Sequence, residues 1–227
     1  MTSTQLKMIA IVTMLIDHTG AILFPDLLVL RMIGRVAFPI FAFLLVEGYF
    51  HTKDVGKYLL RLGVFALISE IPFDWALFHN PFYVWYQNIF FTLCIGLLAI
   101  WVFDQSKDKN PNLAWLSLGA ACLVSLVLGV DYNLLGIMSI FFFYRYHGDQ
   151  VKALRSVALL HLIYGLLGSG LMEGSFSLAG GLQALAGLSM VFLYKYNGEK
   201  GKAPKYLFYG FYPVHLLILG LMNQWLS

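Results

Sequence analysis

The sequence predicts an all-α polytopic membrane protein, a single bundle of about nine transmembrane helices with a cytoplasmic N-terminus. Hydrophobic residues make up 59% of the 227 residues, charged residues make up only 12%, and the mean hydropathy is +0.75. A soluble domain contains about 45–50% apolar and about 25% charged residues, and a chain of this length cannot bury so much apolar surface from water. A soluble globular protein and a disordered one are therefore excluded. The apolar runs are also continuous, whereas outer-membrane barrels show alternating segments of ~10 residues.

Nine segments are apolar over most of the roughly 20 residues that a spanning helix needs. In chain order they are 6–24, 30–50, 57–78, 88–103, 113–130, 133–146, 152–169, 178–194 and 206–226. The first is too long and too polar for a signal peptide, because it contains Asp17 and His18 and no small-residue cleavage site follows it. The fourth and sixth are short, which favours a thinned or protein-lined part of the bundle. Brief connections join all nine, so we expect residues 1–227 to form a single transmembrane domain.

The basic residues lie almost entirely on one side of these segments. The loops after the second, fourth, sixth and eighth segments contain Lys53, Lys57, Lys107, Lys109, Arg145, Lys152, Arg155, Lys195, Lys200, Lys202 and Lys205. Lys7 and Arg61 fall on the same side, which accounts for 13 of the 15 basic residues. Because cytoplasmic loops carry an excess of Lys and Arg, the pattern predicts a cytoplasmic N-terminus and an external C-terminus.

Polar residues gather at one level of the predicted bundle, in its outer half. An ionisable group inside a bilayer costs roughly 2.5–3.5 kcal/mol and commonly marks a functional site. The residues at this level are Asp17, His18, Arg31, Arg35, Glu70, Asp74, Asn88, Asp131 and Asn133. We expect them to line a polar pocket that opens to the external side.

Helical spacing suggests how the charged groups pair. Arg31 and Arg35 are four residues apart and share a helix face, and so do Glu70 and Asp74. If these faces are opposed, two guanidinium groups meet two carboxylates, either as part of a site or merely to hold the second and third spans together. Adjacent helical residues point about 100° apart, so Asp17 need not touch the next side chain and can face an arginine instead.

His18 is the leading candidate for chemistry, since a histidine changes charge near neutral pH and this one lies at the level of the charged groups. Tyr212 and His215 share a face of the last segment. They are either part of the polar site or members of an interfacial aromatic belt with a packed histidine. His161 is isolated in its segment and is expected to be structural. No histidine pair with metal-ligand spacing lies inside a span, so we predict no metal site. The sequence also contains no Walker A loop and no nucleophile elbow.

Several motifs extend from the first span to the last. They are Leu6-Lys7-x-Ile9-Ala10, Asp17-His18-Thr19-Gly20, Arg31-x-x-Gly34-Arg35-x-Ala37-Phe38-Pro39-Ile40-Phe41, Glu47-Gly48, Ser69-Glu70-Ile71-Pro72-Phe73-Asp74, Asn88-Ile-Phe-Phe91-Thr92-Leu93 and Phe208-Tyr209-Gly-Phe-Tyr212-Pro213-Val-His215. In this order the chain resembles the TraX family, membrane proteins named for the acetylase of conjugative F-pilin. Thr19 stands where that family is expected to have an aliphatic residue, a minor departure.

The resemblance implies a membrane-embedded acetyltransferase of the bacterial inner membrane that moves acetyl from acetyl-CoA to an extracytoplasmic amine, such as a peptide or pilin N-terminus. It implies the lipid bilayer as a partner and no nucleic acid. The catalytic residues would be His18, Asp17, Arg35 and Glu70, and the substrate-binding residues would be Arg31, Asp74, Asn88, Tyr212 and His215. Arg35 or Asn88 would stabilise the oxyanion of the tetrahedral intermediate. Whether acetyl passes directly or through an acetyl-histidine stays open.

Cytoplasmic coenzyme A would dock its phosphates on the basic inner face, with pantetheine between the helices. The expected cofactor-binding residues are Lys53, Lys57, Arg61, Arg145, Lys195 and Lys202. Arg61 and Arg145 are the stronger candidates because each ends a span, whereas the positive-inside rule alone explains most of the others.

Two other functions use the same residues. The Asp–His–Arg cluster could serve as a relay in a small transporter or proton-coupled carrier, although such proteins usually show inverted repeats and none is visible here. A membrane O-acetyltransferase would keep acetyl-CoA but take a glycan hydroxyl as acceptor. The sequence does not discriminate among acceptors, and it indicates neither the oligomeric state nor a pilus system.

Overall fold

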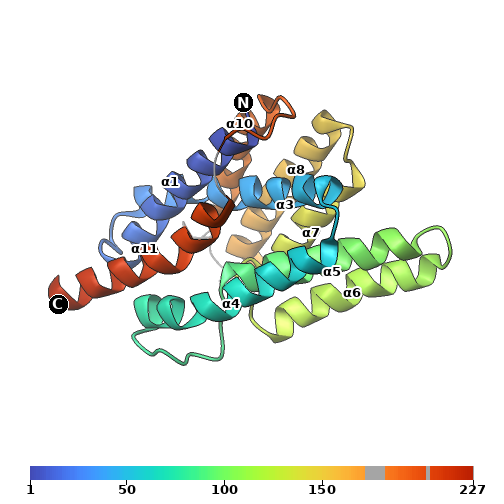
Figure 1. The fold of residues 1–227 in the computed structure, drawn as a ribbon. Helices are drawn as coiled ribbons and strands as arrows, with labels where there is room; N and C mark the ends of the chain where they lie inside the picture. The colour runs from blue at the N-terminus through green and yellow to red at the C-terminus, as the bar shows by residue number, and fades with distance from the viewer. Residues whose placement is uncertain (172–181, 203–204, 227) are drawn as a thin grey trace.

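The computed structural model describes residues 1–171, 182–202 and 205–226, which form a bundle of helices joined by short connections (Figure 1). In chain order the elements are α1 (Ser3–Ile22), α2 (Leu28–Gly34), α3 (Ala37–His51), α4 (Val55–Phe78), α5 (Ile89–Ser106), α6 (Pro111–Val127), α7 (Asn133–Arg145), α8 (Gln150–Leu171), the 3₁₀ helix η1 (Gln183–Leu188), α10 (Ser189–Tyr194) and α11 (Lys205–Leu226). These described ranges contain no β-strand, which confirms the all-α prediction for them.

Four helical segments of the described chain are long and apolar enough to cross a membrane. They are Leu28–His51, Ile89–Ser106, Gln150–Leu167 and Tyr206–Leu226. Helices α1 and α4 are also 20 and 24 residues long, but they carry more polar side chains, and α6 and α7 are shorter, at 17 and 13 residues. The number of nine spans and the cytoplasmic N-terminus therefore stay predictions.

The second predicted span, 30–50, is interrupted, because α2 ends at Gly34 and α3 begins at Ala37. Pro39 lies in the first turn of α3 and has no N–H to donate to the carbonyl of Arg35, so the helical hydrogen-bond ladder lacks a bond at this point. The interruption lets α2 pack against α1, while α3 packs against both α1 and α7. In the eighth predicted span, 178–194, residues 178–181 lie outside the described residues, and η1 and α10 form the rest.

The first and last helices, α1 and α11, lie side by side, and the two termini lie at opposite ends of the bundle (Figure 1). Helix α11 also packs along α4, which continues to α5, and α5 packs on α6 and α7. Leu6 and Ala10 of α1, Ala66 of α4 and Leu216 of α11 are fully buried where these helices meet. Apolar contacts among distant parts of the chain therefore hold the polar residues of α1 and α11 together.

The loop before α11 is attached to the start of α1. The N–H groups of Ser3 and Thr4 donate to the carbonyls of Glu199 and Lys200, at 2.8 and 3.1 Å. Thr2 caps α1 with its side chain in a capping box, which satisfies backbone donors at the helix start. The basic loop is thus held beside Lys7.

The connection between α4 and α5 is joined to the turn between α6 and α7. The Gln87 N–H donates to the Gly129 carbonyl at 3.1 Å, and the Asp131 N–H donates to the Gln87 carbonyl at 2.9 Å. Gly129 has φ +61°, and a Cβ there would lie 2.4 Å from the carbonyl oxygen of Trp85. This turn therefore requires glycine, and it fixes Asp131 near the ends of α1 and α2.

Candidate active site

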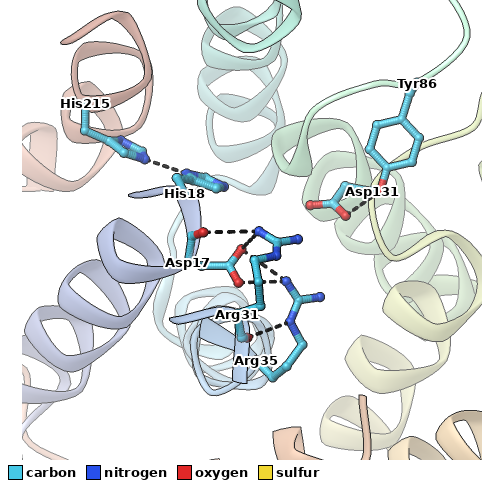
Figure 2. Close-up of polar contacts among 7 residues, drawn as sticks. All are labelled: Asp17, His18, Arg31, Arg35, Tyr86, Asp131 and His215. Atoms are coloured by element: carbon cyan, nitrogen blue, oxygen red, sulfur yellow. Dashed lines mark hydrogen bonds and ion pairs between the residues drawn. The ribbon is translucent and has the colours of Figure 1, made fainter. Parts of the chain in front are cut away.

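A polar cavity of about 150 Å³ lies between α1, α2, α3, α4, α11 and the turn that precedes α7. Its polar lining residues are Asp17, His18, Arg31, Arg35, Tyr86, Asp131, Tyr132 and Tyr212. Met14, Phe38, Phe41, Phe73, Leu77 and Ile89 are among its apolar lining residues. The structure therefore brings together the sequence-predicted polar residues of the first two spans and the turn after α6 (Figure 2).

Asp17 accepts hydrogen bonds from both arginines (Figure 2). Arg31 Nη1 lies 2.7 Å from Asp17 Oδ2, and Arg35 Nη2 lies 2.9 Å from Oδ1 and 3.1 Å from Oδ2. The Asp17 side chain is 10% exposed and that of Arg35 17%. The pairing of the two arginines with Glu70 and Asp74 is wrong. Helix α2 packs against α1, and Asp17 of α1 is the carboxylate that both arginines reach.

Gly34 allows this close approach of α2 to α1. A Cβ at this position would lie 2.0 Å from Asp17 Oδ1 and 2.2 Å from Asp17 Cβ, distances that real Cβ atoms do not show. Any other residue would have to displace the Asp17 side chain from the guanidinium groups. The glycine in the Arg31-x-x-Gly34-Arg35 motif thus belongs to the geometry of the ion pairs.

Glu70, Asp74 and Asn88 lie outside the polar cavity and bond among local groups. The Asn88 amide donates to Glu70 Oε2 and, at 2.8 Å, to the carbonyl of Ala66. Asn88 Oδ1 caps α5 by accepting from the Phe90 N–H at 3.0 Å, and Asp74 Oδ2 accepts from the Tyr83 N–H at 2.8 Å. These three residues therefore fix the connection between α4 and α5, and neither carboxylate has a cationic partner among the described residues.

His18 and His215 form a hydrogen-bonded pair between α1 and α11 (Figure 2). His18 Nδ1 lies 2.6 Å from His215 Nε2, and His215 Nδ1 lies 2.8 Å from the carbonyl oxygen of Phe211. The two rings are nearly parallel, at 7°, with centroids 4.9 Å apart. The sequence indicated both residues as site residues but did not predict that they bond to each other across 197 positions.

This chain of hydrogen bonds fixes the tautomers of the two neutral rings. A backbone carbonyl only accepts, so His215 Nδ1 must carry the hydrogen that reaches Phe211. His215 Nε2 is then an acceptor, and His18 Nδ1 must donate to it. The remaining nitrogen, His18 Nε2, keeps a free lone pair. His18 is therefore oriented to act as a base or a nucleophile through Nε2.

A second cavity, of about 410 Å³, lies on the other side of Tyr212. Its cationic and histidine lining residues are Lys7, His51, Arg61 and Lys200. Its apolar lining includes Leu44, Leu45, Leu62, Phe90, Leu93 and Phe208. This basic cavity uses the N-terminal parts of α1 and α4, whereas the polar cavity uses their C-terminal parts, so the two cavities extend toward opposite ends of these helices.

Four residues line both cavities and form what we call the common wall. They are Met14, Phe41, Ile89 and Tyr212. The Tyr212 ring contacts the edge of His18, with centroids 5.9 Å apart, and that of His215, at 5.6 Å. The histidine pair thus lies beside the wall that separates the polar cavity from the basic one.

The six basic residues predicted to bind the cofactor do not line one common cavity. Arg61 lines the basic cavity, and its buried Nε has no hydrogen-bond partner within the described chain. Arg145 lines a separate cavity that also contains Asp104 and Lys107. The other four, Lys53, Lys57, Lys195 and Lys202, are exposed and line neither the basic nor the polar cavity. Charge placement along the chain assigns a membrane side but not a position around the bundle, so the sequence does not indicate which of the six residues line a cavity.

Sequence reasoning also missed residues that the structure brings to these cavities. Lys7 and Lys200 reach the basic cavity because the loop before α11 is bonded to the start of α1. Tyr86 donates to Asp131 at 2.8 Å beside the polar cavity (Figure 2). The Leu6-Lys7 motif was a usable signal for Lys7. The positions of Lys200 and Tyr86 depend on contacts between distant segments, which the sequence does not show. The described residues contain no group of three or more potential metal ligands.

Apolar helices around a buried polar site define a polytopic membrane protein. The family model described as "TraX protein" matches residues 2–223, and the chain belongs to the TraX family. It is 29% identical to the probable fimbrial assembly protein FimC, serogroup H1, of Dichelobacter nodosus, over 95% of this chain and 93% of that protein. It is 26% identical to Protein TraX of Escherichia coli strain K12, over 96% of this chain and 85% of that protein. The inner membrane-spanning protein YciB of Shewanella amazonensis is 30% identical over 50% of this chain and 58% of that protein. No solved structure matches this chain.

Proposed function

We propose that the protein transfers an acetyl group from acetyl-CoA in the basic cavity to an amine in the polar cavity. The observation that carries this proposal is the common wall with the histidine pair beside it. A donor from one side and an acceptor from the other can meet there without either crossing the bilayer. The bacterial inner membrane, with the basic cavity facing the cytoplasm, is the proposed location.

The basic cavity suits an anionic thioester with a long uncharged arm. Coenzyme A carries about four negative charges on its phosphates, and cationic groups bind phosphate through charge-assisted hydrogen bonds. Lys7, Arg61 and Lys200 lie at the end of the cavity away from the polar site. The Arg61 Nε, buried and without a partner in the described chain, is a donor available to such a ligand. The apolar lining between these cations and the common wall suits the pantetheine arm.

In the transfer step, His18 Nε2 takes a proton from the amine nitrogen as that nitrogen bonds to the carbonyl carbon. The attacking amine must be neutral, and a peptide α-ammonium with a reference pKa of about 7.7–8.0 is deprotonated near neutral pH in a larger fraction than a lysine ammonium with a pKa of about 10.4. The acceptor class we propose is therefore an N-terminal amine. The Dichelobacter nodosus relative is named a probable fimbrial assembly protein, which supports a fimbrial or pilin subunit as the acceptor.

Labelled acetyl-CoA tests the proposal on the purified, detergent-solubilised protein. We expect label on a peptide with a free N-terminus and none on the same peptide with a blocked N-terminus. Label on a glycan instead would indicate an O-acetyltransferase. No labelled acceptor, together with uptake of solute or protons by proteoliposomes, would contradict the proposal in favour of a transporter.

Arg61→Ala should raise the KM for acetyl-CoA about tenfold or more while leaving the KM for the acceptor unchanged. A hydrogen bond to a charged group contributes about 1.5–3 kcal/mol, and about 1.4 kcal/mol corresponds to tenfold in affinity. Steady-state kinetics with each substrate varied in turn provide the measurement.

Lys57→Ala is the matched control, because Lys57 is one turn earlier on α4, is exposed, and its ammonium group pairs with Asp54 at 3.2 Å. We expect its kinetic constants to stay within twofold of wild type. An unchanged KM for acetyl-CoA in Arg61→Ala would show that the cosubstrate does not use the basic cavity.

A further inference from the structure

The hydroxyl of Tyr212 is a buried donor that no described residue accepts. Tyr212 is 3% exposed, lies in the common wall, and its Oη has no hydrogen-bond partner within the described chain. Leaving a buried polar group unpaired costs about 1–3 kcal/mol, and such groups are rare in folded proteins. A hydroxyl in this position therefore suits an acceptor atom that arrives with a ligand.

The two oxyanion donors expected from the sequence are less well placed for a carbonyl that comes from the basic cavity. Arg35 bonds to Asp17 through Nη2 and to the carbonyl of Arg31 through Nε at 3.4 Å, and it lines the polar cavity but not the basic one. The Asn88 amide donates to Ala66 and Glu70, and Asn88 lines neither cavity. Tyr212 differs from both, because it lines both cavities, its ring packs against that of His18, and its hydroxyl has no partner among the described residues.

We propose that the Tyr212 hydroxyl donates a hydrogen bond to the carbonyl oxygen of the acetyl thioester as it becomes an oxyanion. This inference rests on the proposed acetyl transfer and names a catalytic residue for it. Tyr212 lines both cavities and its ring lies 5.9 Å from that of His18, centroid to centroid. A carbonyl that reaches the common wall from the basic cavity meets this hydroxyl while the amine waits beside the histidine.

The electrons and protons balance in this step. The amine nitrogen forms a bond to the carbonyl carbon, the π electrons move to the oxygen, and the Tyr212 hydroxyl stabilises that oxyanion while keeping its own proton. His18 Nε2 takes the proton from the nitrogen. When the carbonyl re-forms, the carbon–sulfur bond breaks, and the coenzyme A thiolate takes the proton back from His18. The products are an N-acetylated amine and free coenzyme A.

Tyr212→Phe tests this role, because it removes only the hydroxyl and keeps the ring contacts with both histidines. Loss of one oxyanion donor lowers kcat by about 10²–10³-fold. We expect that loss in kcat, with both KM values within twofold of wild type and no fall in melting temperature. Tyr206→Phe, on an exposed tyrosine of the same helix, should leave kcat unchanged.

A second measurement separates catalysis from packing. S-ethyl-CoA has a methylene in place of the carbonyl, so it should bind wild type and Tyr212→Phe with equal Kd. Weaker binding by the variant, or a lower melting temperature that accounts for the lost activity, would assign Tyr212 a packing role and overturn the inference. Wild-type kcat in Tyr212→Phe would also overturn it while leaving acetyl transfer intact, whereas an inactive wild-type protein would overturn the proposed function as well.

Discussion

Replacing His18 with alanine is expected to lower kcat/KM for acetyl transfer by at least about 10²-fold, the range for loss of a general base or nucleophile. The hydrogen bonds from Phe211 through His215 leave Nε2 of His18 as the free nitrogen beside the polar cavity. Alanine removes that nitrogen and no other histidine lines this cavity. The measurement is transfer of labelled acetyl to a peptide amine by protein quantified in the membrane.

His161→Gln is the matched control for this variant. His161 is also buried, but it bonds to Ser139 and Gln183, at 3.1 and 2.9 Å, and lines neither the polar nor the basic cavity. We expect this variant to keep most of the activity. Near-normal turnover of His18→Ala at normal accumulation would instead mean that the histidine pair only joins α1 to α11.

Replacing Asp17 with alanine is expected to have the largest effect on stability, because two partly buried guanidinium groups would lose the carboxylate that they share. Removing one partner of a buried ion pair costs about 3–5 kcal/mol. For a chain of this size that corresponds to a fall of about 10 °C in melting temperature, measurable on the detergent-solubilised protein with and without acetyl-CoA. The freed arginines should also disturb the polar cavity and lower activity.

Asp54→Ala provides the comparison, because Asp54 and Lys57 form an exposed pair whose contribution is screened by water. The hydrogen bond from the Lys57 backbone N–H lowers the pKa of Asp54, whose side chain caps α4. We expect a fall of only a few degrees in melting temperature, from the loss of the helix cap. If Asp17→Ala melted like Asp54→Ala, the arginines would have another counter-charge, and Asp131, which lines the same cavity, would be the first candidate.

Local signals in the sequence predicted the helices well. The first predicted span, 6–24, corresponds to α1 at Ser3–Ile22, and the third, 57–78, corresponds to α4 at Val55–Phe78. Hydropathy gives such limits because the polar connections between helices interrupt the apolar runs. The interruption at Arg35 had a local signal in Pro39, which removes one hydrogen bond from the helical ladder.

Partner choice inside the bundle was harder to predict. A spacing of four residues places Arg31 and Arg35 on one helix face, but it does not say which helix that face meets. In the structure α1 packs against this face, so both arginines form ion pairs with Asp17. Glu70 instead accepts a hydrogen bond from the Asn88 amide. The same limit applies to His18 and His215, because their contact depends on the packing of α1 against α11 at the two ends of the chain.

Sidedness of the reaction in sealed vesicles tests the central claim most directly, because the common wall separates a donor cavity from an acceptor cavity. Vesicles of known orientation would receive labelled acetyl-CoA on one face and a membrane-impermeant peptide amine on the other. We expect acetylated peptide only when acetyl-CoA is on the face that bears Lys7, Arg61 and Lys200 and the peptide is on the opposite face. Efficient acetylation with both substrates confined to one face, and none across the bilayer, would contradict transfer through the wall.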